Sequence, residues 1–233
     1  MPAVKARSRK AVLLDDPVMA ALVQAAGRYA LRIQREREPF ESLVRAIAHQ
    51  QLSGVVAQRI LERFCALYPG AAFPTPAALL ATSPESLRAV GFSFAKIRAL
   101  HDLAEKTSTG IVPPGDTLRE MDDESIIERL SSVRGVGRWT VEMLLMFQLG
   151  RPDVWPVDDF GVRNGFRLAY GLKQMPTPHA LRNFGERWRP HRSAAAWYLW
   201  RAVDLHRAGE LPPPRRPAPR LARRTKRRGA NAH

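Results

Sequence analysis

Apolar residues recur along most of the chain with the spacing of amphipathic helices. In the segment "PFESLVRAIAHQQLS" they fall at positions i, i+3, i+4, i+7 and i+8, namely Phe40, Leu43, Val44, Ile47 and Ala48. The next segment, "GVVAQRILERFCALYPG", continues this spacing and stops at a Pro-Gly pair. Strict alternation of apolar and polar residues, which would indicate strands, is scarce. The pattern therefore predicts an all-α fold.

Proline, glycine and hydroxyl side chains divide this pattern into short helices. Thr75-Pro76 and Ser83-Pro84 each place a capping hydroxyl directly before a proline at the first helical position, which is a typical helix start. Comparable signals separate the later segments, including "RWTVEMLLMFQLG" and "PHRSAAAWYLWRAVDLHRAG". We expect about ten short helices and no sheet.

Length and composition narrow the class of protein. The chain has 233 residues, of which 45% are hydrophobic, and this suffices for one or two domains with a substantial core. No apolar run approaches the roughly 18–20 residues of a membrane span, and the N-terminus does not resemble a signal peptide. The single cysteine, Cys65, leaves no disulfide framework and no cysteine-based zinc or iron–sulfur site. These features predict a cytoplasmic protein.

The formal net charge of +15 is concentrated at the two ends of the chain. Eight Arg and Lys residues lie in residues 211–233 and four in residues 1–10, with no acid in either segment. Subtracting both groups leaves +3 on residues 11–210. We expect a folded body over residues 11–210, a basic disordered N-terminus and a basic Pro/Arg-rich disordered tail. The tail fits either binding to a polyanion or a merely solubilising role.

The segment "SVRGVGRWTVE", residues 132–142, predicts two helices joined by a tight turn. Its two glycines permit positive φ or close backbone approach, so amides at the second helix's N-terminus can face an anion. Neither the Lys-Ser/Thr of a P-loop nor the strand of a dinucleotide site is present. Two interpretations remain, a turn that binds nothing or a DNA-backbone site formed by Val133, Arg134, Gly135, Val136 and Gly137.

Four blocks together resemble one known family. They are "IAHQQLS", "LSSVRGVGRWTVEMLLMF", "DVWPVDDFGVRNGF" and "ERWRPHRSAAAWYLW". The chain resembles the helix–hairpin–helix DNA glycosylases over about residues 40–205, and in particular the alkylation-repair branch of 3-methyladenine DNA glycosylase II. The resemblance implies a two-lobed helical fold without an iron–sulfur cluster, with the active-site cleft between the lobes. The central lobe would span about residues 75–150, with the hairpin at 123–150, and the flanking segments would form the second lobe.

The resemblance also implies one catalytic aspartate in "WPVDDFG". Breaking an N-glycosidic bond builds positive charge on the sugar, and a fixed carboxylate stabilises that charge. Alignment from the basic residue Arg163 selects Asp159, whereas alignment on the proline selects Asp158. Either aspartate can also be the N-cap of the helix that follows.

The tryptophan at the hairpin helix predicts the type of glycosylase. In family members that also cut the strand, a lysine at the position of Trp139 forms a Schiff base with the sugar. Without that amine the nucleophile is water, and the enzyme is expected to be monofunctional. The resemblance places Trp139 and Trp200 in a pocket for cationic alkylated bases, with Phe160 beside the acid, although each aromatic could instead be core. Met143 occupies a pocket position that is often tyrosine in this branch.

A base inside a duplex must be flipped out before it can be cut, and its space must be filled. The resemblance gives this plug role to Gln51, which could otherwise be a helix-end glutamine that bonds nearby backbone. It also implies a monovalent cation, Na⁺ or K⁺, held by the backbone carbonyls of Ser131, Val133 and Val136. No other cofactor is expected to be required. Trp155, Trp188 and Trp197 are expected to be core residues.

These observations predict a monomeric, monofunctional DNA glycosylase that excises alkylated purines such as 3-methyladenine and 7-methylguanine from double-stranded DNA. No membrane partner is expected. Two alternatives stay open at this point. One is a noncatalytic helix–hairpin–helix DNA-binding module, and the other is a glycosylase for oxidised or deaminated bases.

Overall fold

The computed structural model describes residues 8–214, and within them it contains thirteen α-helices, one 3₁₀ helix and no strand. The predicted all-α fold is therefore confirmed. The chain divides into two compact units, one made of Met1–Leu31 with Pro152–His233 and the other of Arg32–Arg151. The unit that contains the hairpin thus begins at Arg32 rather than near residue 75, because the helix over Pro39–His49 packs against later helices of this unit.

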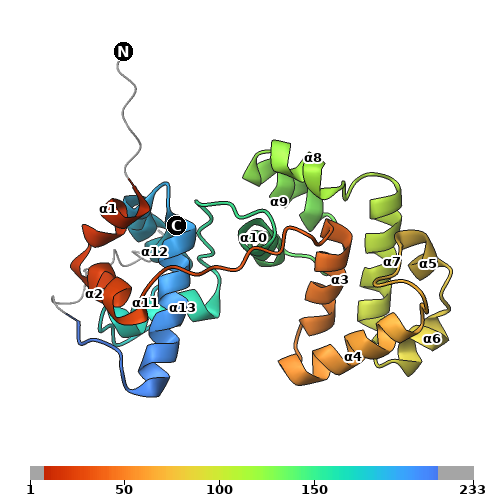
Figure 1. Ribbon diagram of the computed structural model, residues 1–233, viewed down its shortest axis with the longest axis horizontal. Coiled ribbons are helices and arrows are strands. Elements are labelled where there is room, and N and C mark those ends of the chain that lie inside the picture. The colour runs from red at the N-terminus through yellow and green to blue at the C-terminus, as the bar shows by residue number, and fades with distance from the viewer. Residues whose placement is uncertain (1–7, 215–233) are drawn as a thin grey trace, which may run out of the picture. The chain divides into compact units, whose positions relative to one another are not determined.

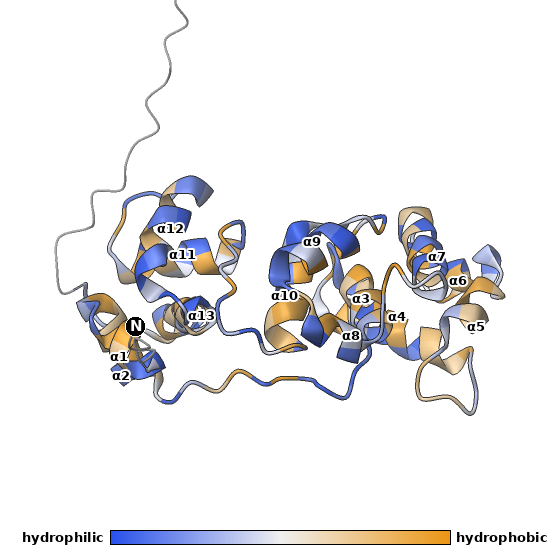
Figure 2. Ribbon diagram, turned by 90° about the horizontal axis from the view of Figure 1, so that it is seen from above, coloured by the Kyte–Doolittle hydropathy of each residue, from blue (hydrophilic) through white to orange (hydrophobic). Residues whose placement is uncertain are grey.

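The unit Arg32–Arg151 contains eight helices (Figure 1). They are α3 (Pro39–His49), α4 (Gly54–Ala66), α5 (Pro76–Leu80), α6 (Pro84–Ala89), α7 (Phe94–Ser108), α8 (Gly115–Glu120), α9 (Asp123–Ser131) and α10 (Arg138–Phe147). Helix α7 packs against α3 and α5, and α10 packs against α9 and α3. The helices carry polar and apolar faces (Figure 2), as the sequence pattern predicts.

Side-chain caps begin many of these helices. The Thr75 hydroxyl accepts the Ala78 amide at 3.2 Å, and the Ser83 hydroxyl accepts the Ser86 amide at 3.2 Å. Both predicted helix starts are therefore confirmed. Such caps supply acceptors for first-turn amides that have none within the helix.

The second unit, Met1–Leu31 with Pro152–His233, packs around its last long helix. It contains α1 (Arg9–Leu14), α2 (Pro17–Ala26), α11 (Phe160–Ala169), α12 (Pro178–Gly185), the 3₁₀ helix Glu186–Trp188 and α13 (Arg192–Ala208). Helix α13 contacts both α11 and α2. A Cβ atom at Gly165 of α11 would lie 1.9 Å from the carbonyl oxygen of Leu199, so only glycine permits this approach of α11 to α13.

Aromatic packing fills the interior of this unit. Trp155 and Trp188 are 6% and 0% exposed, as predicted for core residues, and their rings meet edge to face at 5.2 Å. Trp197 is only half-buried and meets the ring of Tyr29 at 5.3 Å.

The two basic ends fall largely outside the described residues. The folded body begins slightly earlier than residue 11, since the Ser8 hydroxyl caps α1 and accepts the Ala11 amide. The expectations for residues 1–7 and 215–233 lie outside the described range. Within residues 8–214, no helix has the length and apolar character needed to cross a membrane.

Candidate functional site

The predicted hairpin is present as α9, a six-residue turn from Ser132 to Gly137 and the helix α10 that follows. Val133 and Val136 are buried and anchor the turn in the core of its unit. Gly135 has a φ of +76°, which favours glycine, whereas Gly137 has an extended φ of −99°. Only the first of the two glycines is therefore required by backbone conformation.

The N-terminus of α10 leaves room for a ligand. Its N-cap is Gly137, and no side chain among the described residues caps it. The Thr140 amide of the first turn bonds the Gly137 carbonyl at 2.9 Å. A Cβ atom at Gly137 would meet no atom within 4 Å. This open space adjoins a helix N-terminus, where the helix dipole favours an anion.

Helix α7 supports the hairpin from behind through two charged side chains. The Asp102 carboxylate accepts the backbone amide of Arg134 at 2.6 Å. Lys106 pairs with the same carboxylate at 2.9 Å and donates to the Ser132 carbonyl at 2.5 Å. Partial burial raises the pKa of Asp102, but the Arg134 amide and the Lys106 ammonium lower it by more than burial raises it. The net shift of the pKa is therefore downward. The carboxylate is thus held in its charged form by the turn that it supports.

The carbonyls suggested for a monovalent cation belong to Ser131, the last residue of α9, and to Val133 and Val136 of the turn. The Val133 carbonyl accepts the Val136 amide at 3.0 Å. The Ser131 hydroxyl is buried and has no hydrogen-bond partner among the described residues. The Ser131 hydroxyl therefore keeps unsatisfied hydrogen-bonding capacity. Within residues 8–214, no cluster of three His, Cys, Asp or Glu side chains could hold a metal ion.

The predicted plug residue lies in the short loop between α3 and α4. Gln51 has a φ of +59° and is the only non-glycine residue with positive φ among those described. Such a conformation costs about 1–3 kcal/mol and persists where the surroundings enforce it. The side chain of Gln51 is exposed. The loop is closed by the Leu52 amide, which bonds the His49 carbonyl at 3.2 Å.

One cavity of about 480 Å³ brings the plug, the hairpin and two pocket residues together. It is lined by Ala46, His49, Gln50, Gln51, Gly135, Trp139, Thr140 and Met143. Trp139 is 46% exposed, so it is not a core residue, and Met143 is half-buried. The volume is typical of a small-ligand pocket. Four sequence-predicted residues of this unit (Gln51, Gly135, Trp139 and Met143) thus share one cavity.

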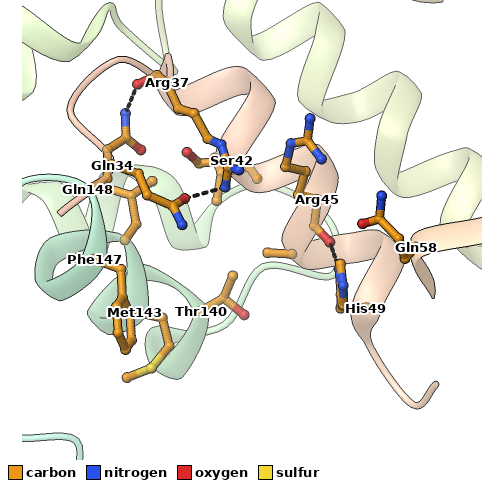
Figure 3. Close-up of a pocket in the computed structure, with 13 residues that line it drawn as sticks. Gln34, Arg37, Ser42, Arg45, His49, Gln58, Thr140, Met143, Phe147 and Gln148 are labelled. Atoms are coloured by element: carbon orange, nitrogen blue, oxygen red, sulfur yellow. Dashed lines mark hydrogen bonds between the residues drawn. The ribbon is translucent and has the colours of Figure 1, made fainter. Parts of the chain in front are cut away.

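A second cavity of about 630 Å³ adjoins the first and shares Ala46, His49, Thr140 and Met143 with it. Figure 3 shows Thr140, Met143 and Phe147 of α10 on one side and Arg45 and His49 of α3 on the other. Hydrogen bonds order its far end, where the Gln148 amide donates to the Arg37 carbonyl at 2.5 Å. Met143 therefore lines both cavities.

The acidic residues lie in the other unit, before α11. Asp159 is 9% exposed and is the N-cap of α11, where its Oδ1 accepts the Val162 amide at 2.7 Å. The indole N–H of Trp200 donates to the same oxygen at 2.8 Å. Asp158, by contrast, is exposed. Asp159 is thus a buried, ordered carboxylate at a helix N-terminus, and the cap interpretation applies to it as well.

Trp200 packs against the first turn of α11 and fixes this carboxylate. A Cβ atom at Gly161 would lie 2.7 Å from Trp200 Cδ1 and 3.1 Å from Asp159 Oδ1. Glycine is therefore needed for the indole to reach the aspartate. Phe160, the residue beside the acid, is 67% exposed and is available to a ligand.

Two contacts in the unit Arg32–Arg151 were not predicted from the sequence. Gln50 donates from its side-chain amide to the Gly135 carbonyl at 2.8 Å, and no local pattern indicates a contact between such distant positions. Phe94, at the start of α7, is 62% exposed, with the Arg88 guanidinium 4.7 Å from its ring centre. An apolar residue directly after the capping Ser93 was the available signal for Phe94.

Comparisons with known proteins match this arrangement. A family model described as "HhH-GPD superfamily base excision DNA repair protein" matches residues 44–190. DNA-3-methyladenine glycosylase 1 from Schizosaccharomyces pombe is 42% identical over 185 residues, which are 79% of this chain and 81% of that protein.

Two solved structures are similar in fold and sequence. A 3-methyladenine DNA glycosylase from Schizosaccharomyces pombe, in complex with abasic DNA, has a TM-score of 0.78 at 40% identity, covering 84% of this chain and 97% of that one. A DNA-3-methyladenine glycosidase from Bacillus halodurans has a TM-score of 0.77 at 31% identity, covering 89% and 94% of the two chains.

Proposed function

The chain belongs to the HhH-GPD superfamily of base excision DNA repair proteins, and on this premise we propose that it is a monofunctional DNA glycosylase. Its substrates are alkylated, cationic purines such as 3-methyladenine and 7-methylguanine in double-stranded DNA. The observation that carries the proposal is Asp159, a buried carboxylate fixed by Trp200 and by the N-terminus of α11. A DNA-binding module without catalysis would use this carboxylate only as a helix cap and would not need the Trp200 indole to hold it as well.

Asp159 acts on the sugar rather than on the base. The bond between the base nitrogen and C1′ breaks, and the base leaves with the electron pair. Positive charge then develops on the sugar, and the fixed carboxylate stabilises it electrostatically. Water adds its oxygen to C1′ and releases a proton, which yields a free base and an abasic site. A purine methylated at N3 or N7 is cationic and departs as a neutral base, so modest catalysis suffices.

Trp139 determines that water is the nucleophile. A strand-cutting glycosylase requires an amine at this position to form a Schiff base, and an indole cannot do so. The exposed ring in its 480 Å³ cavity is instead suited to stack on a cationic base. Met143, which lines the same cavity, supplies a polarisable wall. In the other unit, Trp200 and Phe160 offer aromatic surface beside Asp159.

The hairpin holds the DNA backbone without reading sequence. The uncapped N-terminus of α10 and the open space at Gly137 support a phosphate bound by main-chain amides. The carbonyls of Ser131, Val133 and Val136 would hold a Na⁺ or K⁺ ion, and the unsatisfied Ser131 hydroxyl supports a place for it. When bound, the ion supplies positive charge near the phosphate. The protein acts on DNA as a monomer.

The proposal is tested by release of free base from methylated duplex DNA. Wild type should release 3-methyladenine and 7-methylguanine, whereas Asp159→Asn should bind the duplex and lose about 10²–10³ in rate, the effect of removing one preorganised charge. Asp158→Asn is the matched control and should stay near the wild-type rate, since Asp158 is exposed. Base release that survives in Asp159→Asn but not in Asp158→Asn would transfer the role to Asp158.

A further inference from the structure

Gln50 links two segments that the reaction uses for different purposes. It is the C-cap residue of α3 and directly precedes the left-handed Gln51. Its side-chain Nε2 donates to the carbonyl of Gly135, 85 positions away, at 2.8 Å. Gly135 is the turn residue whose positive φ shapes the hairpin. The plug loop and the hairpin are therefore joined by one direct side-chain hydrogen bond.

Helix α7 fixes the same two segments from one face. Near its start, the Lys96 ammonium donates to the Ala48 carbonyl at the end of α3, at 2.7 Å. Three positions further along α7, the Cβ of Ala99 lies 3.4 Å from where a Cβ atom on Gly135 would be. Six positions after Lys96, Asp102 accepts the Arg134 amide of the turn. Positions spaced in this way share one side of a helix. The distance between the plug loop and the hairpin is thus set by α7, and Gln50 bridges it.

From this geometry we propose that Gln50 is a positioning residue that couples the hairpin's hold on a phosphate to the insertion of Gln51 into the vacated base stack. The inference rests on the proposed glycosylase function. A left-handed non-glycine residue keeps its conformation only where its surroundings enforce it, and the Gln50 hydrogen bond is the enforcing contact on its N-terminal side. Without that bond the loop relaxes, while the amides of the hairpin still bind DNA.

The first test compares base release from methylated duplex and methylated single-stranded DNA. In single turnover, Gln50→Ala should act about tenfold more slowly on the duplex, in keeping with the loss of one hydrogen bond, and within about twofold of wild type on the single strand, which needs no flipping. Gln24→Glu and Gln50→Glu add the same charge, but only the latter should reproduce the duplex defect. Gln24 is an exposed residue of α2.

Equal losses on duplex and single strand would show a merely structural role and would overturn the proposal. So would a duplex rate equal to that of wild type. In a Gln51→Ala background, Gln50→Ala should slow duplex excision by less than about twofold, because coupled residues act non-additively. Fully additive losses would contradict the coupling.

A second readout does not depend on base release. A duplex carries an abasic-site analogue with 2-aminopurine opposite it, and the fluorescence change on binding reports the side chain that contacts the unpaired base. Wild type and Gln24→Glu should give the full change, and Gln50→Ala and Gln51→Ala should both lose most of it at saturating protein. An undiminished change in Gln50→Ala overturns the inference. Absence of base release by wild type would instead refute the proposed function alone.

Discussion

Asp159 is the N-cap of α11, and under the proposed function it is also the catalytic acid. Its Oδ1 caps α11 through the Val162 amide and accepts the indole N–H of Trp200. Both partners are donors that meet the same oxygen, so the position of the carboxylate is fixed by two hydrogen bonds. The cap and the catalytic acid are therefore compatible, and the cap fixes the position of the acid.

Gly161 tests whether the Trp200 contact matters for the reaction. A Cβ at this position would lie 2.7 Å from Trp200 Cδ1, so Gly161→Ala should displace the indole from Asp159. We expect base release to fall about tenfold or more, since small misplacement of a catalytic group is costly, while duplex binding is retained. The check is single-turnover release beside a binding titration. An unchanged release rate would mean that Trp200 does not position the acid.

Trp139 makes a prediction about the chemistry of the intermediate. Because an indole forms no Schiff base with the sugar, sodium borohydride added during turnover should trap no covalent protein–DNA complex, and the product should be an intact abasic strand. Denaturing electrophoresis of the reaction resolves both species. A strand-cutting glycosylase with the lysine serves as the positive control, and a trapped band with this protein would refute the monofunctional assignment.

Local signals at the level of single residues were predictable from the sequence, and distant contacts were not. Thr75 and Ser83 cap helices as predicted because a hydroxyl before a proline acts within four residues. The Gln50–Gly135 and Asp102–Arg134 contacts join positions 85 and 32 apart, and no local pattern encodes them. Gly137 is a different case, because its φ is extended and glycine is not needed there for positive φ. What distinguishes this position is the open space beside it.

At the scale of elements, the hairpin is held by α7 as much as by its own turn. Asp102 and Lys106 bond a backbone amide and a carbonyl of the turn, so polar contacts from α7 hold the turn while the N-terminus of α10 has no side-chain cap. Apolar periodicity predicted that α7 would be a helix. This periodicity could not predict which polar residues of α7 face the hairpin, because a local pattern does not specify how helices pack around one another.

Asp102 gives this support a pH dependence. The pKa of its carboxyl is lowered in the folded protein, with burial outweighed by the Arg134 amide and Lys106. Its stabilising contribution is therefore complete above the ordinary pKa of about 4 and disappears as pH falls through the lowered value. Asp102→Asn should melt below wild type at pH 7, and the two melting temperatures should converge as pH falls below about 4. Asp204→Asn, which breaks an exposed pair with Arg201, is the control and should show less difference at pH 7.

At the scale of the whole molecule, the fold class and the family could be predicted from the sequence, whereas the division of the chain was only partly predictable. The helical pattern and the four motif blocks led to an all-α member of the family, which the structure and the comparisons confirm. The boundary near residue 75 was implied by the resemblance. The structure instead groups α3 with α7 and α10, since contacts between helices define a unit.

Charge is the property that belongs to the whole chain. Of the net +15, eight positive charges fall after Pro214. Removal of residues 215–233 keeps Pro214, whose ring packs beside Gly171, 2.9 Å from where a Cβ atom on that glycine would be. The truncation therefore keeps all the described contacts of the folded unit. If the tail binds DNA phosphates, truncation should weaken duplex binding and lower the slope of log K against log salt. The slope would fall by about 0.9 for each phosphate that the tail neutralises, and by about 7 at most.

The salt series separates the two roles open to the tail. A solubilising tail leaves both the slope and the affinity unchanged after truncation, because counterion release depends only on charges that contact phosphate. A DNA-binding tail changes both together, and base release at low salt should stay near wild type, since Asp159 and the hairpin are retained. A lower affinity with an unchanged slope would contradict a purely electrostatic role and would indicate that the tail touches bases or sugars instead.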